Sequence, residues 1–326
     1  MRLSAFTIVD AHPESERHRD RFAEVLELAE VCDTAGLSTL WVAEHHFHPG
    51  GVCPSPPVLL AAAGARTRRL RLGVLVSVLP FHSPIELAEQ YALLDRLVGG
   101  RLEVGVGSGY IPLEFEGFGI APESKRELFD RNLERLLAGL RGEPIAHGSS
   151  GEIRLNVRPV QVPHPPIRVA VQRREALPHL ARRSLSIALI PYATVPDLAA
   201  LAEEIGEYRA ALPPGVTAEV SVALHLYAGA AVAEARAALQ RYLDARLATQ
   251  STNYQARVHA DPHVATAAGV EATGFALLGS AATVRERLRE FERAGVDEVL
   301  GIFDFGALAA GLVHRSVAAL AAEWGA

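Results

Sequence analysis

Short runs of aliphatic and β-branched residues alternate with longer amphipathic stretches along almost the whole chain. The runs have the length and composition of strands buried on both faces, and the stretches between them repeat apolar residues at helical spacing. Eight runs are predicted to be strands: Leu3–Val9, Thr39–Glu44, Leu70–Val76, Leu102–Gly107, Ile167–Val171, Ser186–Ile190, Val220–Tyr227 and Glu298–Phe303. This α/β alternation predicts a parallel sheet covered by helices. A closed (β/α)8 TIM barrel is the simplest arrangement, and an open doubly wound sheet is the alternative.

Local signals mark where several helices begin and end. The segment Ser83–Glu86 reads Ser-Pro-Ile-Glu, a capping box with proline at the first helical position, so a helix is expected to begin there. Val284, Leu288 and Phe291 recur at helical spacing, and Gly295 follows where that helix is expected to end.

Two stretches interrupt the regular alternation. The first lies near residues 142–166 and contains two short β-like pieces, Ile153–Val157 and Val160–Val162. The second, residues 251–274, is polar with scattered histidines. We expect both to be insertions in a single domain that spans residues 1–326. Loops of this length in a compact domain are often lids or binding loops.

Composition narrows the class of protein. With 326 residues, 49% hydrophobic and 21% charged, the chain has the make-up of a globular protein rather than a disordered one. The net charge of −6 comes without a long run of one sign, so we expect no nucleic-acid partner. No apolar stretch reaches the roughly 20 residues that span a bilayer, so we expect no membrane insertion. Two cysteines, Cys32 and Cys53, cannot form a disulfide framework, and the apolar run at the N-terminus is too short for a secretion signal, so we expect a cytoplasmic protein.

Histidines gather where the second predicted strand ends. Barrel enzymes place catalytic groups at the carboxyl ends of their strands, and the sequence there is Glu44-His45-His46-Phe47-His48. Histidine acts as a base near neutral pH or binds a metal ion. His45 directly follows Glu44 and is the candidate base, whereas His46 and His48 are expected to shape the loop. No second cluster of metal ligands is visible, so no metal site is predicted. A metal-dependent hydrolase built on the three histidines is the most distant alternative.

Two further strand ends carry candidate binding residues. The fourth strand ends in Gly105-Val106-Gly107-Ser108-Gly109-Tyr110, where alternate glycines indicate either close approach of a ligand or barrel packing. The pattern is neither a dinucleotide-binding fingerprint nor a nucleophile elbow, and Lys125, the only lysine, stands in no P-loop motif. The fifth strand ends in Gln172-Arg173-Arg174 just before a helix, which suits either an anion site or a solvated basic turn.

Several segments between Gly36 and Arg141 together match the pattern of a known family. They are Trp41–Phe47, Ala65–Gly73, Leu79-Pro80 with His82–Ile85, Ala88–Gln90, Leu94-Asp95, Gly99–Gly107, Glu114-Phe115 and Gly117–Gly119. In this order they resemble the bacterial luciferase-like family of flavin-dependent monooxygenases. A weaker match continues through Leu278–Ser280 and Ala294–Asp297 to Phe303–Gly306.

The resemblance implies a (β/α)8 barrel with reduced FMN bound over its C-terminal mouth. It places the catalytic base on His45 and a non-proline cis peptide, which backs the flavin ring, at Leu75-Val76. The cofactor-binding residues implied are Leu75, Val76, Ser108, Gly109, Tyr110, Gln172, Arg173 and Arg174. Two positions depart from the family pattern, because many relatives carry an arginine where Ser108 stands and an acidic or hydroxyl-rich turn where Gln172–Arg174 stands. Either the positive charge has moved from one turn to the other and FMN still binds, or the affinity for flavin or the identity of the flavin has changed.

The function implied is FMN-dependent monooxygenation of a small organic substrate with O2, with reduced flavin supplied by a separate reductase. A deazaflavin-dependent oxidoreductase of the same fold and a non-catalytic flavin-binding protein are the alternatives. Residues 251–274 are expected to form a mobile lid over the flavin. A homodimer is expected through the helix Pro57–Arg66, whose small residues Ala61–Ala65 permit close approach of a second helix or equally pack on the barrel.

Overall fold

A ring of parallel strands forms the centre of the molecule. In the computed structural model, which describes residues 1–11, 20–249 and 252–325, one sheet has the order β10-β9-β11-β1-β2-β3-β4-β7-β8, and β8 also pairs with β9. That last pairing closes the ring, so the predicted barrel is confirmed and the open sheet is wrong. The ring strands are β1 Arg2–Thr7, β2 Thr39–Val42, β3 Arg71–Val78, β4 Leu102–Gly107, β7 Ile167–Val171, β8 Ser186–Leu189, β9 Val220–Ala228 and β11 Glu298–Ile302.

One more strand joins the sheet outside the predicted set. The strand β10, Ala276–Gly279, pairs in parallel with the second half of β9, from His225 to Ala228. Its four residues lie immediately before a helix, and so short an apolar run is not distinguishable from the start of that helix by periodicity. It finds a partner because β9 is nine residues long and extends beyond its pairing with β8.

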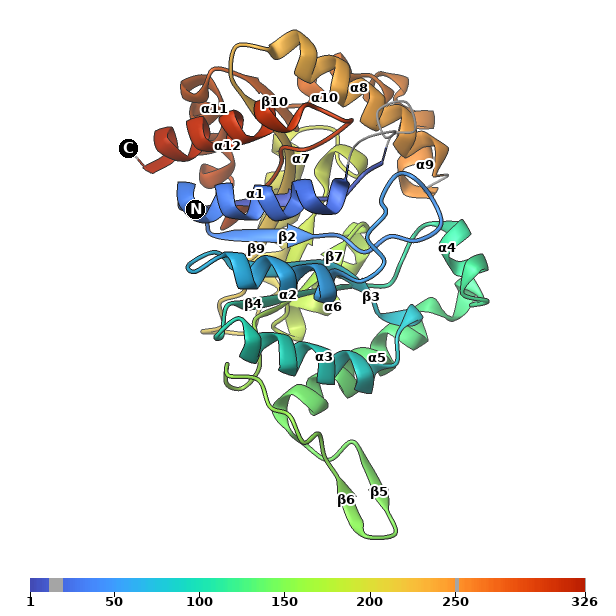
Figure 1. Cartoon of the computed structure of the whole chain (residues 1–326). Helices are drawn as coiled ribbons and strands as arrows, with labels where there is room; N and C mark the ends of the chain where they lie inside the picture. The colour runs from blue at the N-terminus through green and yellow to red at the C-terminus, as the bar shows by residue number, and fades with distance from the viewer. Residues whose placement is uncertain (12–19, 250–251, 326) are drawn as a thin grey trace.

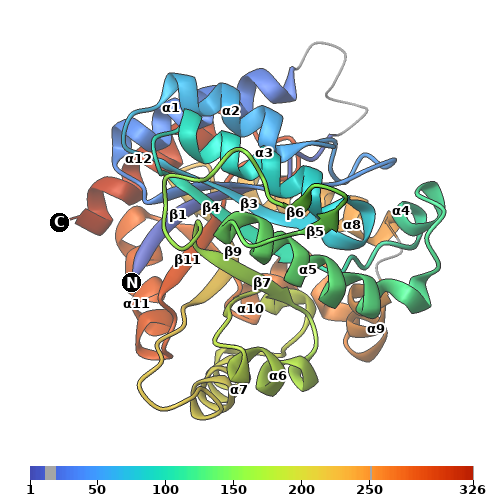
Figure 2. The same ribbon diagram turned by 90° about the horizontal axis from the view of Figure 1, so that it is seen from below.

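Helices surround the ring on the outside (Figure 1). They are α1 Arg21–Ala35, α2 Pro56–Arg66, α3 Pro84–Leu97, α4 Pro112–Gly117, α5 Lys125–Arg141, α6 Leu177–Arg182, α7 Leu198–Ala210, α8 Val232–Ala248, α9 Thr252–Ala260, α10 Ala267–Ala272, α11 Ala281–Arg293 and α12 Ala310–Gly325. In Figure 2, α1, α2 and α3 lie on one side of the strands and α6 and α7 on the opposite side. No helix within the described ranges is long and apolar enough to cross a membrane.

The predicted helix signals act as expected. The Ser83 hydroxyl accepts from the Glu86 N–H at 3.5 Å, and Pro84 opens α3. Val284, Leu288 and Phe291 form the buried face of α11, and Gly295 directly after it has a φ of +93°, which favours glycine.

Both interrupting stretches differ from the prediction. Residues 142–166 contain an antiparallel hairpin, β5 Ala146–Gly148 and β6 Gly151–Ile153, which projects from the barrel (Figure 1). The prediction of β-structure at Ile153–Val157 and Val160–Val162 is therefore wrong, apart from Ile153, which is the last residue of β6. Around Val160 the chain lies against the barrel instead, because the carboxylate of Asp95 accepts from the backbone N–H groups of Val160 and Gln161 at 2.7 and 3.0 Å.

The predicted loop 251–274 is largely helical. Within its described part, α9 and α10 flank a short 3-10 turn at Pro262–Ala265. The Tyr254 side chain is fully buried, and its hydroxyl donates to the Val264 carbonyl at 3.1 Å. The prediction of a loop without secondary structure is therefore wrong, since short helices held by buried side chains carry too little local periodicity to be recognised.

The amino ends of the strands close the bottom of the barrel with paired charges. Arg168, on β7 and 1% exposed, donates to the carboxylates of Glu103 and Glu298, and its guanidinium lies 4.3 Å from the centre of the Trp41 ring. The charges of Arg168 and Arg2 hold the pKa of Glu298 well below its ordinary value although burial alone would raise it. We call the group Trp41, Glu103, Arg168 and Glu298 the barrel floor. Chemistry is expected at the other end.

Candidate active site

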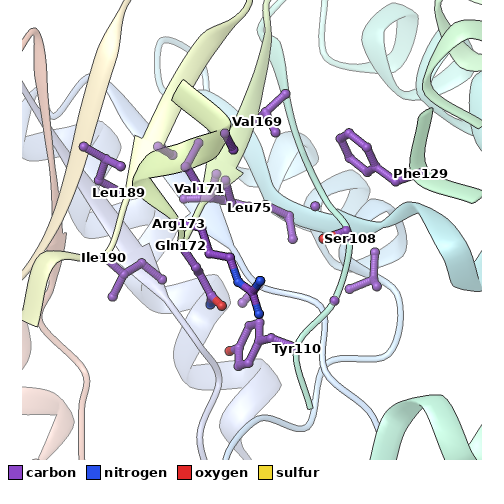
Figure 3. Close-up of a pocket in the computed structure, with 18 of the residues that line it drawn as sticks. Leu75, Ser108, Tyr110, Phe129, Val169, Val171, Gln172, Arg173, Leu189 and Ile190 are labelled. Atoms are coloured by element: carbon purple, nitrogen blue, oxygen red, sulfur yellow. The ribbon is translucent and has the colours of Figure 1, made fainter. Parts of the chain in front are cut away.

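A cavity of about 530 Å³ opens at the carboxyl ends of the strands. This volume lies within the usual range for ligand sites. Its walls include nearly every residue predicted to bind a cofactor, together with His45: Leu75, Val76, Ser108, Gly109, Tyr110, Gln172 and Arg173. Figure 3 shows the Arg173 side chain reaching into the cavity toward the side where Tyr110 lies.

Arg174 is the predicted site residue that the structure places elsewhere. It does not line this cavity, and its Nε donates to Glu207 Oε2 at 2.8 Å on α7. The backbone explains the divergence, because Arg173 is extended, with a φ of −133°, and Arg174 begins a 3-10 turn. Of the two adjacent arginines, only Arg173 faces the site.

His45 is held by a buried carboxylate that sequence reasoning did not single out. His45 Nδ1 lies 3.0 Å from Oε1 of Glu114, on α4, and the two residues are 6% and 1% exposed. Burial lowers the pKa of His45 below its ordinary 6.5, and the Glu114 carboxylate only partly opposes this. The imidazole is thus neutral at pH 7. Because a carboxylate only accepts, Nδ1 carries the proton, and Nε2 keeps the lone pair of a base.

The remaining histidines of the cluster form hydrogen bonds to buried glutamates. His48 Nε2 lies 3.2 Å from the same Glu114 oxygen, which also accepts from the His46 N–H at 3.0 Å. Burial alone would raise the pKa of Glu114, but the hydrogen bond from His45, together with those from His48 and His46, lowers it to about 2. His46 itself turns to Glu44, 3.1 Å away, and His82 reaches the same carboxylate at 2.8 Å.

One trio has the residue types of a metal site. Ligand atoms of His45, His48 and Glu114 lie within 4.8 Å of one another, and two histidines with a carboxylate are ligands that zinc accepts. The distances of 3.0 and 3.2 Å to the carboxylate are those of hydrogen bonds. The hydrolase alternative required His46 as well, and His46 turns to Glu44 instead.

The alternate glycines of β4 serve barrel packing. A Cβ on Gly105 would meet Leu75 Cδ1 and the Val74 carbonyl at 2.6 Å, and a Cβ on Gly107 would meet Val76 Cγ2 at 2.7 Å. The glycines thus make room for the β3 segment beside them. That segment contains the cis peptide Leu75-Val76, as predicted, and the pairing of β3 with β4 shifts register between Val74 and Ser77.

Lys125, the single lysine of the chain, is a cavity residue that was not among the predicted site residues. It begins α5, and its Nζ lies 5.9 Å from the centre of the Phe115 ring. Burial and then the charge of Arg173 lower the pKa of Lys125, so two cationic side chains act on each other in the cavity wall. α4 and a 3-10 turn separate Lys125 from the end of β4, so the sequence carried no direct signal of its place in the cavity.

Arg246, on α8, is the second missed cation. It is 4% exposed and lines the cavity, and its Nη2 donates to the Tyr110 hydroxyl at 2.6 Å. Leu239, Tyr242 and Leu243 share the buried face of α8, and Arg246 continues their spacing. An arginine in the register of an apolar helix face was the signal that could have identified it.

Comparison with known proteins identifies the family to which these features correspond. The model of the luciferase-like monooxygenase family matches residues 1–298. Among curated relatives, 4-hydroxyprotoasukamycin monooxygenase of Streptomyces nodosus subsp. asukaensis is 40% identical over 152 residues, 44% of this chain and 40% of that protein. The oxygenase component of the flavin-dependent trigonelline monooxygenase of Acinetobacter baylyi is 27% identical over 179 residues, 53% of this chain and 49% of that protein.

A solved structure agrees over a longer span. The monooxygenase RslO1 from Streptomyces bottropensis superposes with a TM-score of 0.83 at 28% identity, covering 99% of this chain and 98% of that one. The matches to the first curated relatives, by contrast, span only 40% to 56% of those proteins' own length.

Proposed function

The chain belongs to the luciferase-like monooxygenase family, and from this premise we propose that it is an FMN-dependent monooxygenase that oxidises a small organic substrate with O2. The observation that carries the proposal is the cavity at the strand ends. It combines a neutral, carboxylate-held histidine with two cationic side chains suited to a phosphate. When bound, reduced FMN supplies the electrons for the reaction with oxygen.

The residues present fit such a cofactor. Leu75, Val76 and the other aliphatic side chains at the strand ends offer an apolar wall for a flat ring. Lys125, Arg173 and the Ser108 hydroxyl offer the charge and hydrogen bonds that a phosphate needs. The family resemblance implies an arginine at the position of Ser108. Lys125 thus joins Arg173 in replacing that arginine, and Arg174 drops out of the proposed site.

His45 is the proposed catalytic base. The Glu114 carboxylate fixes its tautomer through Nδ1, so that Nε2 can accept a proton from a reacting group and later return it. Glu114 is the positioning residue. Burial of both groups excludes water from the hydrogen bond that holds the ring.

The partners of this activity are also proposals. A separate reductase supplies reduced flavin, which is supported by the trigonelline relative being an oxygenase component. The homodimer and the cytoplasmic location stay predictions. Of the small residues of α2, Ala63 and Gly64 are buried against the barrel, whereas Ala62 and Ala65 are exposed beside Val58 and leave an outer face for a second helix.

Flavin binding by the purified protein tests the proposal. Titrations with FMN, riboflavin and a deazaflavin are expected to show that FMN binds best. In the double variant Lys125→Met, Arg173→Met, FMN affinity should fall about 10- to 100-fold because charge-assisted bonds to the phosphate are lost, while riboflavin affinity stays the same. Arg174→Met is the matched control and should leave both affinities unchanged.

Three results would contradict the proposal. The wild type could bind no flavin, it could prefer the deazaflavin, or the double variant could lose FMN and riboflavin equally. The second result would support the deazaflavin-dependent oxidoreductase in its place. Oxygen uptake with reduced FMN then distinguishes an oxygenase from a protein that only binds flavin.

A further inference from the structure

Arg246, on α8, carries a buried positive charge beside the cavity. Within the described ranges, no carboxylate forms an ion pair with it, and its Nε and Nη1 have no hydrogen-bond partner. Its one hydrogen bond is to the Tyr110 hydroxyl at 2.6 Å, and the guanidinium lies 4.8 Å from the centre of the Tyr110 ring. Arg246 thus lines the cavity while two of its buried nitrogen atoms have no hydrogen-bond partner among the described residues.

The surroundings of Arg246 are aromatic rather than acidic. Tyr110, Tyr192 and Tyr242 line the same cavity as Arg246. Burial raises the pKa of Tyr110 and of Tyr242, so their hydroxyls keep their protons and supply no negative charge. An isolated buried charge is costly, and a folded protein normally pairs it or replaces it by an apolar residue.

The position of Arg246 relates it to the catalytic end of the cavity. The rings of Tyr110 and His45 are 6.3 Å apart, and the charge of Arg246 contributes to the lowered pKa of His45. The proposed phosphate-binding site, by contrast, consists of Lys125 and Arg173, and the charge of Arg173 lowers the pKa of Lys125. The cavity therefore has two cationic parts, one of them beside the base.

We propose that Arg246, with Tyr110, binds the carboxylate of an anionic substrate and so directs the neighbouring part of that substrate toward His45. Each planar fork of a guanidinium includes Nη2, which keeps a second N–H beside the one that it gives to Tyr110. Nη2 together with the unpartnered Nε or Nη1 therefore matches a carboxylate. This inference rests on the proposed function, because it assigns the substrate of that same site. It restricts the small organic substrate to the class of carboxylic acids.

Matched pairs of carboxylates and their neutral amides test the inference without knowledge of the substrate. Calorimetric titrations compare benzoate with benzamide, and octanoate with octanamide. The proteins are the wild type, Arg246→Met, Arg246→Lys and the control Arg236→Met. Arg236 lies on the same helix, where it pairs with Glu271 at the surface. At least one carboxylate is expected to bind wild type about 10- to 100-fold more tightly than its amide. Arg246→Met abolishes that preference, Arg246→Lys keeps part of it, and Arg236→Met keeps all of it.

Two further readouts separate this role from other roles of Arg246. Thermal unfolding of Arg246→Met is expected at or above the wild-type temperature, because an unpaired buried charge is removed, and a lower temperature would indicate a structural role instead. FMN and riboflavin affinities of Arg246→Met are expected to equal those of wild type.

The outcomes are distinguishable. No carboxylate preference in either pair, or a preference that survives Arg246→Met, overturns the inference. A loss of FMN but not of riboflavin affinity in Arg246→Met also overturns it, since Arg246 would then bind the cofactor phosphate and the proposed function would still hold. Absence of flavin binding in wild type overturns the proposed function alone, because the carboxylate titrations need no flavin.

Discussion

Two buried arginines at opposite ends of the barrel differ in what surrounds them. At the barrel floor, Arg168 donates to Glu103 and Glu298 and lies over Trp41. At the cavity wall, Arg246 has a tyrosine hydroxyl and leaves Nε and Nη1 without partners among the described residues. The floor neutralises its charge inside the protein, so its arginine serves stability. At the cavity, no carboxylate of the described residues pairs with Arg246, so this arginine is suited to binding an anionic ligand.

The same contrast holds for the carboxylates. Glu298 faces two arginines, and Glu114 faces two histidines, one of which lines the cavity. Charges paired with permanent cations fix a structure, whereas a carboxylate paired with a neutral imidazole fixes a tautomer and leaves a nitrogen for chemistry. Substitutions at the two ends should therefore affect different properties.

The largest effect is expected at the mouth, on turnover. His45→Ala should lower turnover by roughly 10²–10⁴-fold, the usual contribution of a general base, because no other group replaces Nε2. Flavin affinity should be unchanged. The measurement is product formation with reduced FMN and the best substrate found in a screen of carboxylic acids. His46→Ala is the control and should act mainly through loop stability. Wild-type turnover in His45→Ala would show that the base has been assigned to the wrong residue.

At the floor, the expected effect is on stability. Arg168→Met should lower the free energy of unfolding by about 3–5 kcal/mol, because Glu103 and Glu298 would stay buried without their shared partner. Urea unfolding measures it, with Arg246→Met as the matched variant of a buried arginine. If both variants lost the same stability, the difference between floor and mouth would not exist.

Acidification should separate the two ends by pH. The folded-state pKa of His45 is below 6.5. Protonation removes the base, so turnover should fall about tenfold per pH unit once the pH drops below this folded-state pKa. Glu114→Gln should move this limb to still lower pH, because the carboxylate raises the pKa of His45. The acid limb of kcat/KM in both proteins is the measurement. A limb above pH 6.5 would contradict a neutral His45.

The floor should respond only at lower pH. The folded-state pKa of Glu298 is below its ordinary 4.5, so its contribution to stability is present above 4.5 and is lost as pH falls through the folded-state value. Unfolding free energies measured from pH 6 downward should therefore show this loss in wild type. The same series in Glu298→Gln lacks the titrating group, and an identical slope in both proteins would exclude Glu298 as its source.

The smallest effect is expected on the outside of the barrel. Val58 on α2 is 71% exposed beside the outward-facing Ala62 and Ala65. If α2 forms the predicted dimer, Val58→Asp should shift the protein from dimer to monomer with a change in monomer stability within about 0.5 kcal/mol, as for other surface substitutions. Sedimentation at micromolar concentration is the measurement, and a wild type that is already monomeric contradicts the dimer.

The sequence by itself determined the eight strands and their alternation with helices, because these are buried runs whose pattern is local. Closure of the strands into a ring was decided by the pairing of β8 with β9 in the structure. The sequence located the strand ends that carry the cavity, and the family resemblance added the cis peptide at Leu75-Val76, which the structure contains. It could not assign the short strand β10 or the helices within 251–274, where few residues carry the period.

Only the tertiary structure decided which charges face the cavity. Glu114 is 69 residues from His45 in the chain, and Arg246 is 136 residues from Tyr110, so neither pairing has a local signal. Arg173 and Arg174 are neighbours of the same type, yet one lines the cavity and the other pairs with Glu207, because a single change of backbone conformation turns them apart. Strand and helix periods depend on neighbouring residues, whereas the partner of a charged side chain depends on which distant elements pack against it.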